Sequence, residues 1–303
     1  MKKFLSMILA AMMLLSLTAC AEAPVMKVAS PAGAPGLALA TLAVHNPENY
    51  TFVAAETISA EFASAQADFI VAPINAGAKL FKMGKSTYQL AAVVSWGNLF
   101  FASQKEGFKV EDMNGAKVVL FGENTINASV VRYALEKNGI VPAEVEYLGS
   151  AANTQALLLS DAEASVVTAE PALTASKMKN DKITAYAVND LYKAATGFEG
   201  YTQAGLFVKA ETAANQPEAV EAFLKLVEEA CLANAENIPA VAEAAVALEL
   251  LPNVKVATNA IPGCAVKYVN AWEAKEQVEQ TANVDLTQFG GAVPADAFYY
   301  GAK

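Results

Sequence analysis

The sequence is poor in the residues that most metal sites and many active sites require. Its 303 residues include one histidine, His45, one arginine, Arg132, and three cysteines. The one histidine and the two cysteines beyond residue 20 are scattered along the sequence and cannot supply the three His or Cys ligands that a zinc site of this type needs, so neither a metal nor a cofactor is expected. Acidic side chains number 31 against 21 basic ones, for a net charge of −10. Because nucleic-acid binding needs a basic face, nucleic acid is excluded as a partner.

Motifs of nucleotide and nucleophilic chemistry are missing as well. No Gly-x-Gly-x-x-Gly follows a strand-like run, and no Walker-type Gly-x-x-x-x-Gly-Lys-Ser/Thr loop occurs, since Gly84-Lys85-Ser86 has lysine at position 79, where the first glycine would stand. His45 stands beside Asn46-Pro47, distant in sequence from any serine in a nucleophile-type turn. Catalysis would therefore lack a visible nucleophile and base, and we do not expect an enzyme.

The first twenty residues have the pattern of an export signal. Lys2 and Lys3 precede an apolar run over 4–17, which is too short to cross a membrane comfortably but typical of a secretory signal peptide. Small residues then lead to Cys20 in an arrangement that resembles the bacterial lipobox, where the cysteine is acylated and becomes the new N-terminus. The sequence thus predicts an exported protein tethered to the bilayer through Cys20; the alternative is an ordinary signal peptide with a chance cysteine. No later apolar run approaches 18 residues, so we expect no transmembrane helix.

The other two cysteines, Cys231 and Cys264, lie far apart in the sequence. Export permits a disulfide. Two independent buried thiols are the preferred interpretation, and a disulfide remains the alternative.

From residue 25 onward, short β-like runs alternate with amphipathic helical stretches, the pattern of a mostly parallel sheet with crossover helices. The pattern restarts after residue 108, which predicts an α/β protein of two βαβ lobes. Lobe I is expected over 25–103 and 206–303, and lobe II over 108–200. The chain would cross near 102–110 and 199–206, forming a double hinge, and the part after 209 is predicted to be helical.

Ligands of open parallel sheets bind beyond the carboxyl ends of the strands, where helix N-termini expose unpaired N–H groups. The loops at these positions supply the candidate ligand-binding residues, which are Ser30, Gly33, Ala34, Pro73, Asn75, Trp96, Asn98, Asn124, Thr125, Thr154, Glu170 and Tyr201.

Each candidate also has a structural interpretation. Trp96 is either a stacking surface or a core aromatic, and Glu170 is either a counter-charge for a ligand amine or a helix cap. The amide and hydroxyl residues either bind ligand or cap turns. Arg132 falls inside a helix, so the usual arginine clamp for an anion is missing. We therefore expect a neutral or weakly cationic planar ligand containing nitrogen; the alternative is a small anion held by helix N-termini alone.

Several segments resemble one family of importer receptors. They are VASPAGAPGLALATLA (28–43), ADFIVAPINAGAKLFKMG (67–84), AEPALTASK (169–177) and GGAVPADAFYY (290–300). Together with the lipobox, they resemble substrate-binding lipoproteins of bacterial ABC importers, in the family of thiamine-pyrimidine synthesis proteins that also includes nitrate, sulfonate and taurine binders. The last segment is similar to the C-terminal helix of some members.

This resemblance implies a type II periplasmic-binding-protein fold that closes on one small-molecule ligand, such as a pyrimidine vitamin precursor, and passes it to the ABC permease subunits. The receptor is expected to be an extracytoplasmic monomer. A ligand-sensing surface protein and an enzyme on this fold are the alternatives.

Overall fold

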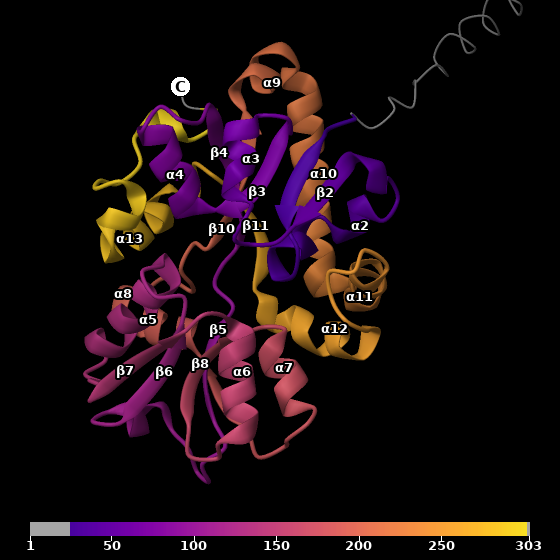
Figure 1. Ribbon diagram of the computed structural model, residues 1–303. Coiled ribbons are helices and arrows are strands. Elements are labelled where there is room, and N and C mark those ends of the chain that lie inside the picture. The colour runs from indigo at the N-terminus through magenta and orange to yellow at the C-terminus, as the bar shows by residue number, and fades with distance from the viewer. Residues whose placement is uncertain (1–24, 302–303) are drawn as a thin grey trace, which may run out of the picture.

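The computed structural model describes residues 25–301, so the predicted signal peptide and Cys20 lie outside the described residues. Two sheets organise the chain, one above the other in Figure 1. The first has the strand order β11-β4-β10-β3-β1-β2 and the second β7-β6-β8-β5-β9. We call each sheet with its packed helices a lobe, the first and the second.

The first sheet contains β1 (Val28–Pro31), β2 (Tyr50–Val53), β3 (Phe69–Pro73), β4 (Tyr88–Ser95), β10 (Ala204–Lys209) and β11 (Val266–Asn270). The second contains β5 (Leu99–Ser103), β6 (Lys117–Phe121), β7 (Glu144–Leu148), β8 (Ser165–Ala169) and β9 (Thr184–Ala187).

The helices are α2 (Ala40–Ala43), α3 (Ser59–Ser64), α4 (Ile74–Lys82), α5 (Ile126–Lys137), α6 (Ala151–Ser160), α7 (Ala172–Lys177), α8 (Val188–Thr196), α9 (Ala210–Asn215), α10 (Pro217–Glu236), α11 (Ile238–Ala247), α12 (Val254–Ala260) and α13 (Lys275–Val284). Short 3-10 turns are η1 (Ala34–Ala38), η2 (Pro47–Asn49), η3 (Val110–Met113), η4 (Ile261–Cys264), η5 (Leu286–Phe289) and η6 (Asp296–Phe298).

Helices cover both faces of each sheet, which is why the central strands are apolar throughout. In β3 every residue from Phe69 to Ala72 is fully buried, as expected for a strand covered on both faces. The first sheet packs against α3 and α4 on one face and α10 on the other, whereas the second packs between α5 and α8 on one face and α6 and α7 on the other. The two-lobed α/β architecture predicted from the sequence is confirmed.

The sheets are more mixed than the mostly parallel arrangement that the sequence predicts. Strand β5 runs antiparallel to β8 and β9, and β10 runs antiparallel to β3 and β4. These are the two strands that follow the crossings between the lobes. Each enters its sheet from the opposite direction, because the chain arrives from the other lobe rather than through a crossover helix.

The first crossing lies earlier than predicted. Strand β4 of the first sheet ends at Ser95 and β5 of the second sheet begins at Leu99, so the chain crosses at 96–98 rather than near 102–110. Residues 99–103 therefore belong to the second sheet and not to lobe I. The return crossing, over 197–203, agrees with the predicted position near 199–206.

The C-terminal part departs from the predicted all-helical arrangement. Strand β11 forms the edge of the first sheet beside β4. The segment GGAVPADAFYY contains only the 3-10 turn η6 and an isolated bridge between Leu90 and Tyr299, where a helix was expected. Pro294 and the consecutive Gly290 and Gly291, both at positive φ, account for this difference, because they interrupt helical backbone geometry.

Cys231 and Cys264 are free and buried, as two independent thiols. Burial raises the pKa of the Cys231 thiol to about 12, so this thiol is protonated at neutral pH. Within residues 25–301, no helix combines the length and apolar character needed for a membrane crossing.

Candidate functional site

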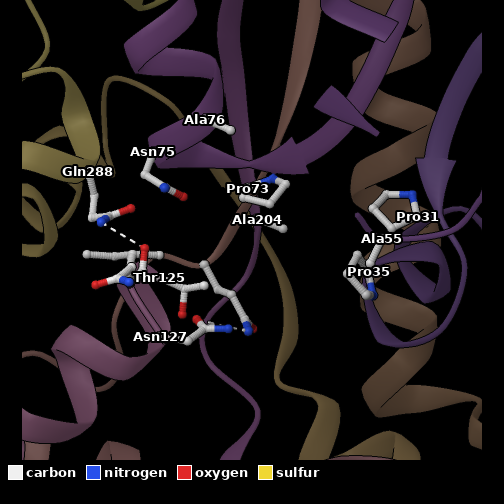
Figure 2. A pocket seen from close by; sticks show the side chains of 13 residues that line it. Pro31, Pro35, Ala55, Pro73, Asn75, Ala76, Thr125, Asn127, Ala204 and Gln288 are labelled. Atoms are coloured by element: carbon white, nitrogen blue, oxygen red, sulfur yellow. Dashed lines mark hydrogen bonds between the residues drawn. The ribbon is translucent and has the colours of Figure 1, made fainter. Parts of the chain in front are cut away.

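A cavity of about 310 Å³ lies between the two lobes, and we call it the cleft cavity. Figure 2 shows residues of the first lobe above it, among them Asn75, and residues of the second lobe below it, among them Asn127. Its polar lining side chains are Asn75, Asn124, Thr125, Asn127, Gln203 and Gln288. The remaining lining residues are Pro31, Pro35, Ala55, Pro73, Ala76, Ile126 and Ala204.

Helix α4 begins directly at the cavity, where β3 ends at Pro73. The first N–H of the helix, from Ile74, donates to the Gln203 carbonyl oxygen at 3.1 Å. No side chain caps this terminus. Asn75 follows in the first turn, and its side-chain oxygen is buried without a hydrogen-bond partner. The terminus therefore offers a partly positive helix end to the cavity, beside a buried amide oxygen that lacks a donor.

Helix α5 begins at the same cavity from the second lobe. Thr125 is its N-cap: the hydroxyl accepts from Ala128 N at 3.3 Å and donates to the Gly122 carbonyl oxygen at 2.6 Å. Asn124 precedes it with φ of 60°, a left-handed conformation that asparagine tolerates better than most residues. Asn127 in the first turn lines the cavity. Two helix N-termini thus meet across one space.

Electrostatically, the cleft cavity is neutral in its side chains and positive in its backbone. None of its lining residues is ionisable, and none is aromatic. The N-terminus of a helix carries roughly half a positive charge, and α4 and α5 both direct theirs here. This arrangement suits a small ligand that accepts several hydrogen bonds.

A network of amide side chains lies beside the cavity at the crossings. Gln203 on the return crossing donates through Nε2 to Asn98 Oδ1 at 3.1 Å and to Asn127 Oδ1 at 3.5 Å. Its own Oε1 accepts from the Ser95 hydroxyl at 3.1 Å. Tyr201 donates to Asn127 Oδ1 at 3.0 Å, and complete burial raises the pKa of its phenol far above the usual value. Both crossings are therefore tied to the cavity wall.

Two polar contacts also bridge the lobes beside the cavity. Gln288 of η5, a turn that packs on α4, donates to the Asn124 carbonyl oxygen at 3.0 Å. Ser129 of α5 donates to Asp285 Oδ2 at 2.7 Å. Burial opposes ionisation of Asp285, but hydrogen bonds from Thr287 and Ser129 outweigh it and lower the pKa of this carboxyl. The C-terminal segment thereby links the first lobe to the start of α5.

Four of the sequence-predicted residues line the cleft cavity, namely Pro73, Asn75, Asn124 and Thr125. Three others, Ser30, Gly33 and Ala34, lie where β1 ends and η1 begins, beside Pro31 and Pro35, which form one wall of the cavity. Asn98 and Tyr201 lie in the hydrogen-bond network rather than in the lining.

Trp96, Thr154 and Glu170 do not line the cleft cavity. The Trp96 indole donates to the Lys267 carbonyl oxygen at 2.9 Å and borders a different cavity. Thr154 is fully buried, and its hydroxyl donates a hydrogen bond to the Ala151 carbonyl oxygen.

Glu170 is buried and makes its contacts within the protein. Its carboxylate accepts from Thr174 N at 3.1 Å and from the Thr174 hydroxyl at 2.9 Å. It packs against Gly263 of η4, so close that a Cβ at Gly263 would lie 2.9 Å from Glu170 Cγ. Burial raises the pKa of this carboxyl. The helix-cap interpretation of Glu170 accounts for these contacts.

The sequence reasoning missed three polar lining residues. Asn127 follows two residues after the predicted Thr125, so the same strand-to-helix rule extended by half a turn would have included it. Gln203 lies on the predicted return crossing, two residues after Tyr201. Gln288 carries no local signal, because it arrives from the C-terminal segment through tertiary packing.

Comparisons with known proteins agree with this geometry. Residues 62–239 match the profile of the family described as NMT1/THI5 like. No curated protein matches the chain in sequence. An ABC transporter from Parabacteroides distasonis has a TM-score of 0.79 at 20% identity, over 92% of this chain and 100% of that one.

Two sulfonate-binding proteins share the fold as well. The periplasmic aliphatic sulphonate binding protein SsuA of Escherichia coli gives a TM-score of 0.71 at 15% identity, over 92% of each chain. The alkanesulfonate-binding protein SsuA of Xanthomonas axonopodis pv. citri, bound to MOPS, gives 0.62 at 13% identity, over 92% of this chain and 99% of that one. At these identities the likeness establishes the fold of a periplasmic binding protein.

Proposed function

Because the chain belongs to the NMT1/THI5-like family, we propose that it is the extracytoplasmic solute receptor of an ABC importer. It captures one small molecule between its lobes and delivers it to the permease subunits as a monomer. The family, the fold and the cavity between the lobes support this function. Closure on the ligand is then a shift in population driven by contacts to both lobes, which the cleft cavity provides through α4 and α5. The function is binding rather than catalysis.

The observation that supports the proposed ligand class is the convergence of two helix N-termini on a cavity without ionisable lining. A neutral or weakly cationic planar ligand containing nitrogen was expected from Glu170, Trp96 and the lack of an arginine in the loops. Neither residue lines the cleft cavity, so that expectation loses its support. The proposed ligand is instead a small anion, such as a sulfonate, taurine or nitrate, held by backbone N–H groups and the amide N–H groups of Asn75 and Asn127. The fold shared with two sulfonate-binding proteins is consistent with this class.

Calorimetry of the purified protein with a panel of methanesulfonate, taurine, nitrate and aminopyrimidines tests the proposal. The anions are expected to bind, and the aminopyrimidines are not. Asn75→Asp places a carboxylate in the first turn of α4, which is compatible with the helix but repels an anion. We expect the affinity to fall by at least about tenfold, as for a loss of some 1.4 kcal/mol.

Asn153→Asp is the matched control, because it makes the same change in the first turn of α6, outside the cleft cavity. Glu170→Gln should likewise leave anion binding nearly unchanged. Saturable binding of aminopyrimidines alone, retained in Asn75→Asp, would overturn the anion assignment. Turnover of the captured compound would replace the receptor with an enzyme.

Membrane attachment is the second part of the proposal. Residues 1–19 act as a signal peptide, and acylated Cys20, as the new N-terminus, anchors the chain outside the cytoplasm; the lipobox-like sequence supports this assignment. Two or more acyl chains hold a protein stably at a bilayer, whereas a single one is marginal. A receptor tethered in this way stays close to its permease.

A further inference from the structure

A second cavity, of about 390 Å³, lies at the β11 edge of the first sheet and shares no lining residue with the cleft cavity. We call it the hinge-edge cavity. Both lobes and both crossings contribute to it through six polar or aromatic side chains and several backbone positions. The side chains are Trp96, Asn189, Glu199, Lys267, Glu273 and Gln277. Its volume falls within the roughly 300–1,000 Å³ of small-molecule sites.

The charge around this cavity is net negative. Two carboxylates, Glu199 and Glu273, line it against one ammonium group, Lys267. Glu199 is largely exposed and pairs with Lys193 at 2.7 Å, a surface contact of little strength. Among the described residues, Glu273 has no ion-pair partner, and neither does Lys267. Glu273 is therefore the carboxylate free to meet a positively charged ligand.

Two buried acceptors in the lining lack donors. Asn189 Oδ1 and Gln277 Oε1 are shielded from solvent and have no hydrogen-bond partner. The orientation of Asn189 is fixed, because its Nδ2 donates to the carbonyl oxygens of Trp96 at 2.8 Å and Gly97 at 3.1 Å. Turning the amide around would bring its oxygen against two carbonyl oxygens. Because both oxygens are shielded, a ligand in the cavity does not contact them, but their uncompensated partial negative charge favours a cation nearby.

An aromatic ring completes the lining. The Trp96 indole is half-buried. Its N–H donates a hydrogen bond to the Lys267 carbonyl oxygen at 2.9 Å, which holds the ring in place. A fixed indole ring attracts cations through its face, with a contribution of about 0.5–2 kcal/mol. Carboxylate, unsatisfied carbonyl oxygens and indole all favour the same chemistry.

We propose that the hinge-edge cavity is a second binding site, for a small organic cation that carries N–H donors, such as an alkylammonium. This site goes beyond the proposed receptor function and does not depend on which solute occupies the cleft. The ammonium lies against Glu273, while its carbon chain packs on Trp96.

Three four-carbon probes of similar size test the assignment by calorimetry at low salt. They are 1,4-diaminobutane, 4-aminobutanoate and 1,4-butanediol, which differ in charge. The diamine is expected to bind saturably and at least about tenfold more tightly than the zwitterion, and the diol not at all. Added salt should weaken binding of the diamine, because salt screens the charge of exposed carboxylates. Equal binding of diamine and diol, tighter binding of the zwitterion, or no binding would overturn the proposal.

Variants locate the binding. Glu273→Gln should weaken diamine binding by about fivefold or more, whereas Glu276→Gln, at an exposed position three residues further along and outside the cavity, should leave it unchanged. In protein labelled with ¹⁵N-tryptophan, the Trp96 indole signal should shift on titration. The chain has two tryptophans, and Trp272→Phe assigns the signals. A diamine that binds Glu273→Gln as tightly as the parent protein, or that leaves the Trp96 signal in place, binds elsewhere and contradicts the site.

Discussion

Asn189 of α8 is wedged against Gly97 of the first crossing: its Nδ2 donates to the Gly97 carbonyl oxygen at 3.1 Å, and a Cβ on Gly97 would lie 2.8 Å from its Oδ1. The same amide lies next to Gly200 of the return crossing, whose Cβ would be 3.0 Å from Asn189 Nδ2. One side chain of the second lobe thus touches both segments that join the lobes. Glycine at these positions is a packing requirement, since the backbone and the amide leave no room for a methyl group.

Replacing Gly200 by alanine should destabilise the protein by about 1–3 kcal/mol, the usual effect of overpacking. The new Cβ would lie 2.5 Å from the Trp96 carbonyl oxygen, and backbone cannot move aside as a flexible side chain can. Urea unfolding measures the change. Gly149→Ala is the control, because its Cβ would meet only Asn153 Oδ1 at an ordinary 3.5 Å. Equal stability of the two variants would contradict the tight packing of the crossings.

Replacing Gln203 by methionine, which has a similar volume, should lower both stability and ligand affinity. The change removes the donor to Asn98 Oδ1 and the acceptor for the Ser95 hydroxyl. Leaving these polar groups without hydrogen bonds should lower the free energy of unfolding by about 1–3 kcal/mol. Urea unfolding and calorimetry with the anion panel give the two quantities.

Gln288→Met is the matched change, because Gln288 lines the same cavity but makes one hydrogen bond to a carbonyl oxygen in an exposed loop. Its effect on stability should stay below that of Gln203→Met. If the two variants lose equal stability, the amide network at the crossings does not act as argued.

Changing Cys20 to alanine should move the protein from the membrane fraction to the soluble exported fraction. Without the thiol there is no acyl anchor, and the aqueous part of the chain has an acidic net charge that disfavours anionic lipid. Immunoblotting of cell fractions and mass spectrometry of the mature N-terminus measure the outcome. A parent protein whose N-terminus carries no lipid, with the same distribution as Cys20→Ala, would exclude the anchor.

The lobes could be predicted from the sequence because local pattern determines them. The apolar run over 69–72 reads as a buried strand, and it is one. The first crossing was misplaced because Leu99–Ser103 follows Ser95 after only three residues and is equally apolar, so nothing local indicates that the two runs pair in different sheets. Strand β11 was missed for a similar reason, since its pairing partner is far away in the sequence.

The site was predictable where a helix follows its strand directly, as at Asn75 and Thr125. It was not predictable where tertiary packing brings in a residue, as with Gln288. Trp96 also ends a strand, but β4 lies on the β11 side of the sheet, away from β1 and β3 whose ends form the cavity. Strand order, which the local pattern does not contain, decides which strand ends meet.

The buried carboxyl of Glu170 should give the protein a distinctive pH dependence. Burial raises its pKa in the folded state above the usual value near 4.5, so the folded protein binds the proton more tightly than the unfolded chain. Stability from this group is therefore greatest at low pH and is lost as the pH rises through the folded pKa. Glutamine stays neutral, so the stability of Glu170→Gln relative to the parent should increase between pH 4 and pH 7 in urea unfolding. Glu163→Gln, at an exposed position, is the control that measures how the loss of one exposed carboxylate changes stability over the same pH range. If the stability of Glu170→Gln relative to the parent instead falls as the pH rises, the folded protein favours the ionised carboxylate.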